Sequence, residues 1–429
     1  MKKLGFWSST SLVTGNMIGS GIFLLPATLA IYGSISLIGW LCSSVGALLL
    51  ALVFRSLGQL QPEALGGPYA YARNALGDFV GFAVAWGYWV SIWCTNAAIA
   101  VACVGYLGVF FPFIIESNVA SASSGLALIW LFTGVNALGL RQVVWVQRMT
   151  TVLKVIPLLL VGFVGVWFVR LEFLLAPPVF EGSLWEAITA TTTLSLFAFL
   201  GLESASIASS KIKNPAKTMG RASLFGTGFT VFTYILCSIV IMGVLPPEAL
   251  VNSTAPFADA AEVFWGVSSK YIIAATAVMA TLGALNGWIL IQGQLPLAAA
   301  SDRLFPAVFG RTNRHDAPIY GIALSSVLAS AVLFLKYSES LVDKFTFMMT
   351  LSTLSALIPY LLSAVSLLVM IRSLRNERKV AKGITALLSM VFCVWVIFGC
   401  GLDVIVYGSI LLLTGLMLYA AKTFYRKTP

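Results

Sequence analysis

The stretch Gly15–Gly21, GNMIGSG, lies in the middle of an apolar run from about Phe6 to Ile31 that is long enough to cross a lipid bilayer. Each glycine costs a helix roughly 1 kcal/mol relative to alanine. A helix that opens inside hydrocarbon also leaves backbone N–H and C=O groups without water to bind. Such a break is tolerated where the freed groups face a cavity or a ligand, so this heptapeptide predicts a binding site within a membrane helix.

The composition predicts an all-α membrane protein. Of the 429 residues, 59% are hydrophobic and 10% are charged, and the mean hydropathy is +0.94, whereas a soluble domain carries about 25% charged residues. Hydropathy and the length needed to cross a bilayer predict twelve transmembrane helices. The expected spans are 7–31, 35–59, 79–111, 124–142, 149–169, 185–209, 222–245, 271–300, 318–336, 344–371, 383–400 and 403–424.

The positions of the basic residues agree with these spans. With both termini in the cytoplasm, 21 of the 26 Lys and Arg residues fall in cytoplasmic segments, four fall outside and Lys154 lies within the fifth span. Basic residues accumulate in the cytoplasmic loops of membrane proteins. We therefore expect a multi-pass protein of the inner membrane, surrounded by the lipid bilayer, and the net charge of +10 requires no nucleic acid partner.

The chain lacks the residue patterns of an enzyme or a metal site. Its six cysteines have no metal-ligand spacing, its single histidine falls in a loop, and the ATP-binding pattern GxxxxGK[ST] is missing. We expect no catalytic residue, metal or cofactor. A channel is a further alternative, but it needs a continuous polar row, and only Glu203 and Lys154 are clearly charged positions within the spans.

A second interruption repeats the first one. The sixth span is broken at Gly201–Ser206, GLESAS, five spans after the broken first span. Discontinuous helices in corresponding positions of two halves are typical of transporters built from repeats, and an odd number of spans per half makes the second repeat inverted. We expect residues 1–170 to form the first repeat and 185–371 the second, with the last two spans and a cytoplasmic tail in 383–429.

Ordinary helix packing is the alternative explanation of the first break. Gly15 and Gly19 form a GxxxG pair, which often marks the close approach of two helices. Asn16 lies between these glycines, and Ser20 directly follows the second one. The sixth span repeats this polar interruption. Together these features favour a binding site over packing alone.

Several ordered motifs connect the chain to a known family. They are GNMIGSGIFLLPA (Gly15–Ala27), GGPYAYAR (Gly66–Arg73), FLGLESAS (Phe199–Ser206), KNPAK (Lys213–Lys217) and IPYL (Ile358–Leu361). With these, nearly the whole chain resembles the amino acid–polyamine–organocation transporter superfamily, and within it the bacterial basic amino acid/polyamine antiporters of the arginine/agmatine type. The resemblance implies a five-plus-five inverted repeat of the LeuT type with helices 1 and 6 broken. It also implies secondary active transport by alternating access, and it is compatible with a homodimer.

The resemblance implies a substrate site between the two broken helices. The half-helix that starts near Gly21 presents free N–H groups and a partial positive charge, which suit a carboxylate. We expect the carboxylate of an amino acid at Ile18, Gly19, Ser20 and Gly21. Its α-ammonium is expected at unwound carbonyls around Asn16, Met17 and Phe197 to Leu200. The other expected contacts are Ser91, Asn96, Phe197, Ala198, Leu200, Trp288 and Ser352.

The gates and the coupling residues follow from the same resemblance. Tyr88, Trp288 and Tyr360 are expected to close over the substrate. Glu203 is a carboxylate inside a span, where burial costs several kcal/mol unless the group is paired or protonated. It is expected to sense protonation, and the alternative is a structural hydrogen bond that ties the break together; both roles can hold at once.

Lys154 departs from the arginine/agmatine antiporters, which lack a lysine there. A cation occupies that neighbourhood in sodium-driven relatives, and a lysine ammonium can substitute for its charge. We therefore expect sodium-independent transport. The alternative is a lysine that extends its ammonium to the cytoplasmic membrane surface.

The sequence is compatible with two classes of substrate. Phe197 occupies the position of a tryptophan that stacks on the substrate in the arginine/agmatine antiporters, and phenylalanine is a weaker cation–π partner. Ala198, Leu200 and Ala284 make this pocket more apolar still. The leading expectation is a permease or antiporter of an amino acid, basic or exchanged with its amine product, so that the partner is an amino acid or polyamine. The alternative is a proton-coupled symporter of neutral apolar amino acids.

Overall fold

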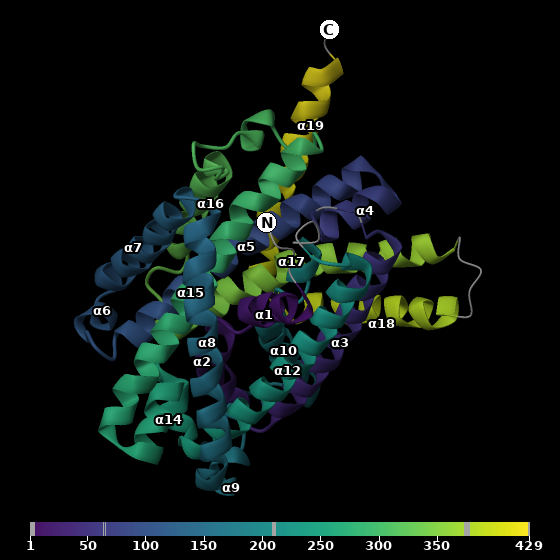
Figure 1. Ribbon diagram of the computed structural model, residues 1–429. Helices are drawn as coiled ribbons and strands as arrows, with labels where there is room; N and C mark the ends of the chain where they lie inside the picture. The colour runs from purple at the N-terminus through teal and green to yellow at the C-terminus, as the bar shows by residue number, and fades with distance from the viewer. Residues whose placement is uncertain (1–4, 63, 65, 208–211, 373–377, 428–429) are drawn as a thin grey trace.

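The computed structural model describes residues 5–62, 64, 66–207, 212–372 and 378–427, with the side chains of all these residues except 140–149, 151–153, 378 and 421–427. Within this part of the chain the regular elements are helices, and no strand is formed (Figure 1). Some basic residues expected in the cytoplasm, Lys2, Lys3, Lys211 and Arg375, lie outside the described residues.

The helices follow the expected spans closely. The long ones are α1 (Phe6–Met17) continued by α2 (Ser20–Leu29) and η1 (Ala30–Tyr32), α3 (Ile35–Leu60), α5 (Asp78–Leu107), α7 (Asn118–Ala137), α8 (Leu140–Gly165), α10 (Leu184–Leu196) continued by η3 (Phe197–Phe199) and α11 (Ser204–Ile207), α12 (Pro215–Val244), α15 (Val267–Ser301), α16 (Ile319–Leu333), α17 (Leu341–Ile371), α18 (Arg378–Phe398) and α19 (Leu402–Lys427). Among the described residues, ten segments are long and apolar enough to cross a membrane. The fifth and ninth expected spans are covered by α8 and by the shorter apolar helix α16, respectively.

Short helices connect the long ones at the two ends of the molecule. Figure 1 shows α9 (Leu171–Leu174) and α14 (Pro256–Trp265) at the lower left, α6 (Phe113–Glu116) at the left edge and α4 (Pro68–Leu76) at the upper right. The segment between Pro246 and Lys270 forms two short helices, α13 (Pro247–Val251) and α14. Between α15 and α16 lies η5 (Ala307–Gly310).

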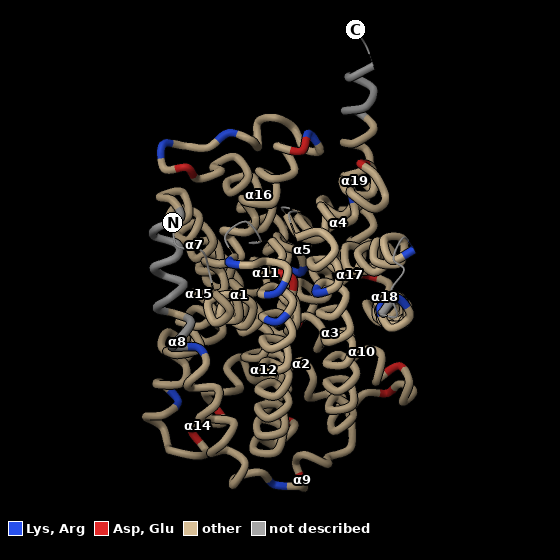
Figure 2. Tube along the Cα trace, turned by 45° about the vertical axis from the view of Figure 1, so that its right-hand side comes forward, with Lys and Arg blue, Asp and Glu red and all other residues tan. Residues whose placement is uncertain are grey.

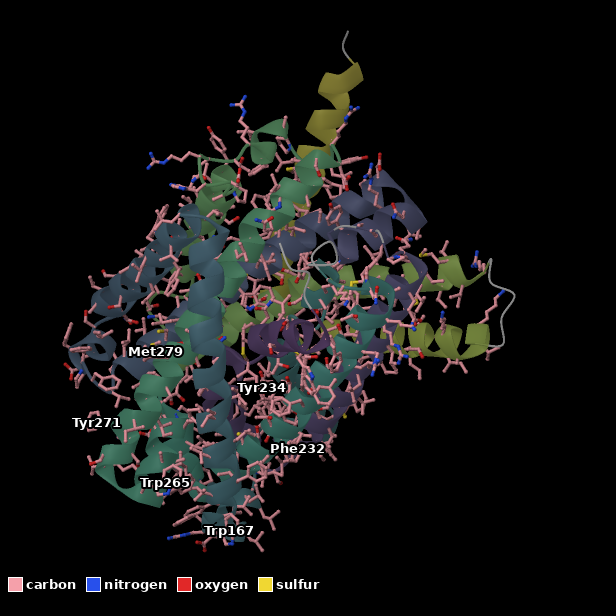
Figure 3. All side chains as sticks on the ribbon, in the orientation of Figure 1. Trp167, Phe232, Tyr234, Trp265, Tyr271 and Met279 are labelled. Carbon is pink, nitrogen blue, oxygen red and sulfur yellow. The ribbon has the colours of Figure 1, made fainter. Side chains whose placement is uncertain are left out.

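Aromatic and charged side chains mark where the apolar bundle ends. Trp167, Trp265 and Tyr271 lie at the end that carries α9 and α14 (Figure 3), and 82%, 43% and 46% of their respective surfaces are exposed. Such residues collect at the border between lipid and water. Figure 2 shows Lys, Arg, Asp and Glu mainly in connections and at helix ends, for example between α15 and α16, while long stretches of helix carry none.

The structure confirms both predicted helix breaks. The first helix stops at Met17 and restarts at Ser20, with Ile18 extended (φ −74°, ψ 91°). The second stops at Leu196, tightens into η3 and opens before α11, with Gly201 at φ +101°. An L-residue with a side chain rarely adopts that backbone conformation, so Gly201 is required there. Two helices are thus opened near their middle, as their glycine content predicts.

Candidate functional site

The two helix breaks face each other across a small cavity. Its volume is about 10 Å³, enough for roughly one water molecule. The lining residues come from α1, α2, α5, η3 and α15 and the breaks themselves; they are Asn16, Met17, Gly19, Ser20, Gly21, Thr95, Ile99, Phe197, Ala198, Leu200 and Trp288. Phe197 is 5% exposed and Trp288 is 2% exposed. The protein is therefore closed around the site, and an amino acid can enter only if the surrounding helices move.

Glycine allows the two breaks to approach each other. A Cβ atom added to Gly21 would lie 2.9 Å from Cα of Ala198, and one added to Gly19 would lie 2.9 Å from Cβ of Ala284. The first turn of α2 reaches the cavity, and its N-cap residue Gly19 supplies no side-chain cap. The first N–H groups of a helix have no partner within the helix and carry a partial positive charge. This edge of the cavity is therefore suited to an anion such as a carboxylate.

Side chains from other helices stabilise the opened end of α1. Nζ of Lys154 on α8 donates to the carbonyl oxygen of Gly15 (2.9 Å), and Oη of Tyr234 on α12 donates to that of Met17 (2.6 Å). Tyr234 is labelled in Figure 3, at the middle of the bundle. Nδ2 of Asn16 donates to Oγ of Ser204 (2.8 Å), which joins α1 to α11. The break in the first helix is thus held by partners that are far away in the sequence.

Glu203 lies at the second break and binds two tyrosines. Its carboxyl group accepts one hydrogen bond from Oη of Tyr88 on α5 and another from Oη of Tyr360 on α17 (2.6 Å). Glu203 and Tyr360 are fully buried and Tyr88 is 1% exposed. One carboxyl group therefore ties the second break to two helices at once.

Comparison with known proteins assigns the chain to a family. The amino acid permease family model matches residues 4–417. The chain belongs to the amino acid permease family. It is 34% identical to the cadaverine/lysine antiporter of Escherichia coli (strain K12), over 100% of this chain and 96% of that protein. It is also similar to the arginine/ornithine antiporter of Pseudomonas aeruginosa (30% identical; 98% and 90% covered) and the putrescine transporter of Haemophilus influenzae (31% identical; 98% and 97% covered).

Most of the expected contacts of this permease lie together. Asn16, Gly19, Ser20, Gly21, Phe197, Ala198, Leu200 and Trp288 line the cavity, while Ile18, Ser91, Asn96 and Ser352 do not. The N–H of Ile18 bonds the carbonyl of Thr14 (2.8 Å). Oγ of Ser352 donates to the carbonyl of Ser91 (2.9 Å) and lies 2.6 Å from Oγ1 of Thr95. Ser91 and Ser352 thus contact residues that line the cavity or each other, without lining it themselves.

Sequence reasoning missed two of the lining residues and expected only a backbone carbonyl from a third. That third residue is Met17, whose carbonyl oxygen accepts a hydrogen bond from Tyr234. Thr95 and Ile99 flank the expected contact Asn96 on the same helix. Positions one residue before and one turn after a predicted contact lie near it on a helix, and this spacing was the available signal.

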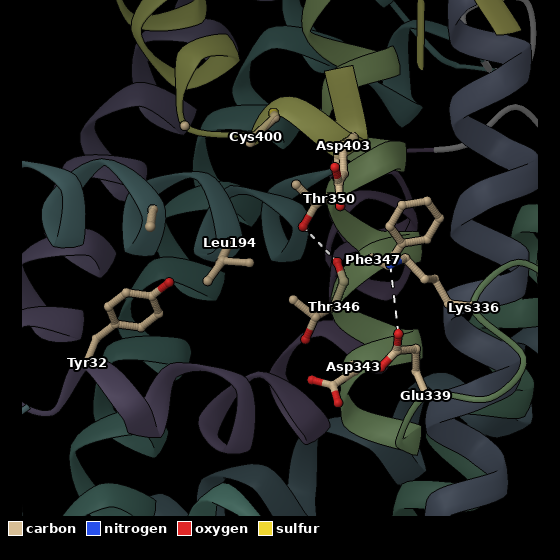
Figure 4. A pocket seen from close by; sticks show the side chains of 14 residues that line it. Tyr32, Leu194, Lys336, Glu339, Asp343, Thr346, Phe347, Thr350, Cys400 and Asp403 are labelled. Atoms are coloured by element: carbon tan, nitrogen blue, oxygen red, sulfur yellow. Dashed lines mark hydrogen bonds and ion pairs between the residues drawn. The ribbon is translucent and has the colours of Figure 1, made fainter. Parts of the chain in front are cut away.

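A larger cavity of about 500 Å³ lies between η1, α10, α17 and the turn before α19 (Figure 4). Its charged lining consists of Glu339, Asp343, Asp403 and Lys336, all solvent-exposed, with Nζ of Lys336 lying 3.8 Å from Oε1 of Glu339. The smaller cavity is the better candidate site because residues of both interrupted helices line it, and buried polar groups such as Asn16 and Ser20 are among them.

A charged contact joins α4 to the end of α15. Nη1 of Arg73 lies 3.1 Å from Oδ1 of Asp302, and Oη of Tyr69 donates to Oδ2 of the same residue (3.1 Å). The hydrogen bond to Asp78 and the nearby Asp302 raise the pKa of Arg73. Burial and then Asp302 raise the pKa of Tyr69. Arg73 therefore stays positively charged and Tyr69 neutral.

Among the described residues no cluster of three His, Cys, Asp or Glu could hold a metal ion.

Proposed function

We propose that this permease is a secondary active exchanger of amino acids, with a basic amino acid or its amine product as substrate, working by alternating access. The observation that carries the proposal is the closed cavity between two opened helices, bordered by the uncapped start of α2. A helix start on one side and opened backbone on the other can bind the carboxylate and ammonium that every amino acid carries.

Relatives support the choice of substrate. Three similar proteins are named for the transport of cadaverine and lysine, arginine and ornithine, or putrescine. All of these compounds carry an amine or guanidinium at the end of an aliphatic chain. We propose that this chain exchanges compounds of the same class.

The position of Lys154 supports transport that does not depend on sodium. Its side chain is 1% exposed, and its ammonium binds the Gly15 carbonyl at the opened end of α1. This contact argues against a lysine that extends to the membrane surface. An ammonium at that carbonyl supplies the positive charge that a bound sodium ion would bring.

Tyr88, Trp288 and Tyr360 are proposed as gates and Glu203 as the coupling residue. Trp288 covers one side of the cavity, and the two tyrosines bind Glu203 at the second break. Opening toward one side of the membrane must break some of these bonds. A carboxyl group whose bonds depend on its protonation can link that opening to pH.

The proposal includes a membrane arrangement. We propose twelve spans, with α8 and α16 completing the ten long segments, and inverted repeats of residues 1–170 and 185–371. The last two helices, in 383–429, stand outside the repeats. The protein would lie in the bacterial inner membrane with both termini in the cytoplasm, either alone or as a homodimer.

A proton-coupled symporter of neutral apolar amino acids is the second candidate. One observation favours it: Ile99, Phe197, Ala198 and Leu200 line the cavity, and none of the described residues lines it with a charged side chain. Such a site could bury an aliphatic side chain at about 25 cal/mol per Å² of apolar surface.

Counterflow in proteoliposomes tests the proposal. Vesicles preloaded with unlabelled lysine should accumulate labelled lysine or cadaverine, with saturation and without a sodium gradient. Uptake of leucine driven by a pH gradient, without lysine exchange, would establish the symporter instead. Flux that neither saturates nor shows counterflow would indicate a channel. A requirement for sodium would refute the role of Lys154, and a pH profile unchanged in Glu203→Gln would refute that of Glu203.

A further inference from the structure

A chain of hydrogen bonds runs from α16 through α15 to α5, beside the cavity. Nε2 of Gln292 donates to the carbonyl oxygen of Ile322 (3.2 Å) and to Oγ of Ser326 (2.8 Å). Oε1 of Gln292 accepts from Nδ2 of Asn96 (2.6 Å). Gln292, Asn96 and Ser326 are all fully buried, so no solvent competes for these bonds.

The backbone carbonyl of Ile322 fixes the orientation of both amides. A carbonyl oxygen only accepts hydrogen bonds, so the amide nitrogen of Gln292 must face it, and the amide oxygen must face α5. Asn96 can satisfy that oxygen only with its own nitrogen. Its Oδ1 is then left over, and this buried oxygen has no partner among the described residues.

Asn96 lies next to residues that line the candidate substrate site, although it does not line the closed cavity itself. Thr95 and Ile99, which lie one residue before and one turn after it on α5, line the cavity. Trp288, one turn before Gln292 on α15, lines it as well. A buried acceptor without a partner is unfavourable, because it has given up water without replacing it. A substrate that brings a donor to this point removes that penalty.

We propose that Gln292 is a positioning residue for specificity: it holds Asn96 with its oxygen free, so that the site prefers a substrate side chain ending in a hydrogen-bond donor. Ammonium and guanidinium groups supply such donors. A methyl group leaves the oxygen unpaired, and a carboxylate places a second acceptor against it. The inference deepens the proposed function and rests on it, because it names the chemical group by which a basic amino acid is chosen.

Lysine and norleucine provide the matched probes. Norleucine is lysine without its terminal ammonium. The inhibition constant of norleucine divided by that of lysine, both measured against labelled-lysine counterflow, therefore measures the preference for the donor alone. In Gln292→Met, Asn96 loses the group that orients it, and the ratio should fall about tenfold, equivalent to about 1.4 kcal/mol. The maximal exchange rate should change much less, because the backbone of the site is untouched.

Three further variants separate positioning from general damage. Gln292→Glu, protonated in this fully buried position, can donate its O–H to the Ile322 carbonyl and still offer an oxygen to Asn96, so it should keep the ratio within about threefold of wild type. Gln294→Met alters a half-buried glutamine on the same helix, two residues away, and should leave the ratio unchanged. In an Asn96→Leu background, Gln292→Met should have no further effect on the ratio, because Gln292 acts through Asn96.

Other outcomes would overturn the inference. An unchanged ratio in Gln292→Met, or equal weakening of lysine and norleucine, would leave Gln292 with only a structural role. If Gln292→Met does not reach the membrane, Gln292→Ala must show the same fall in the ratio, or the inference is wrong. Wild-type protein that exchanges no lysine at all refutes the proposed function before any variant is measured, so the two failures are distinguishable.

Discussion

Removing one hydroxyl from the tyrosine pair at Glu203 should cost measurable stability. Tyr360→Phe deletes the Oη atom that donates to Oε2 of Glu203 at 2.6 Å and changes little else. Both residues are fully buried, so water cannot replace the lost donor. The bond from Tyr88 to the other carboxyl oxygen remains, so the variant isolates one of the two bonds.

The size of the effect depends on the charge of the carboxyl group. A hydrogen bond to a charged group contributes about 1.5–3 kcal/mol, whereas one between neutral groups contributes about 0.5–1.5 kcal/mol. Tyr360→Phe should therefore lower the free energy of unfolding by about 1.5–3 kcal/mol where Glu203 is ionised. In a Glu203→Gln background, where the partner is always neutral, the same substitution should cost about 1 kcal/mol.

The four proteins form a double-mutant cycle. Unfolding in mixed detergent micelles with increasing dodecyl sulfate gives the free energy of each protein, and the coupling between Tyr360 and Glu203 follows by difference. Tyr320→Phe is the control, since Tyr320 is 46% exposed, and it should stay within about 0.5 kcal/mol of wild type. A Tyr360→Phe protein as stable as the control would show that this hydrogen bond does not secure the second break.

Three further outcomes are expected. Gly21→Ala pushes a methyl group to within 3.0 Å of Cβ of Ala198, so it should reduce counterflow at least tenfold. Gly134→Ala is the control and should leave counterflow unchanged, because among the described residues no atom beyond its chain neighbours and local helix backbone lies within 4 Å of the added methyl. Lys154→Met removes the donor to the opened end of α1 and should abolish exchange while the protein still reaches the membrane; wild-type rates in this variant would contradict the contact's importance. Asp302→Asn weakens a pair that is about a third exposed, so unfolding should change by about 1 kcal/mol or less, and a larger loss would contradict this reading of the contact.

The sequence predicted most of the helical architecture because hydrophobicity and glycine act locally. A run of apolar residues is as long as the bilayer is thick wherever it occurs in the chain, so most span boundaries agree with the observed helices within a few residues. The largest differences lie at helix starts. α7, α8 and α12 begin at Asn118, Leu140 and Pro215, several residues before the expected starts of their spans at 124, 149 and 222.

The candidate site was predicted only in part. Backbone breaks at Gly15–Gly21 and Gly201–Ser206 could be found because glycine weakens a helix at its own position. The resemblance to a family then supplied Phe197 and Trp288, which do line the cavity. Asn96, which the resemblance also supplied, does not line the cavity, and its Nδ2 donates to Gln292 on a helix nearly two hundred residues later.

The sequence by itself determined an α-helical membrane protein with two interrupted helices, since chain-local hydropathy and glycine content decide both properties. Only the tertiary structure decided what the polar groups inside the bundle bind. Lys154 finds the Gly15 carbonyl 139 positions away, and Glu203 finds tyrosines 115 and 157 positions away. A buried polar group must be paired to be tolerated, but its sequence neighbourhood does not say with which group. Packing of the helices makes that choice.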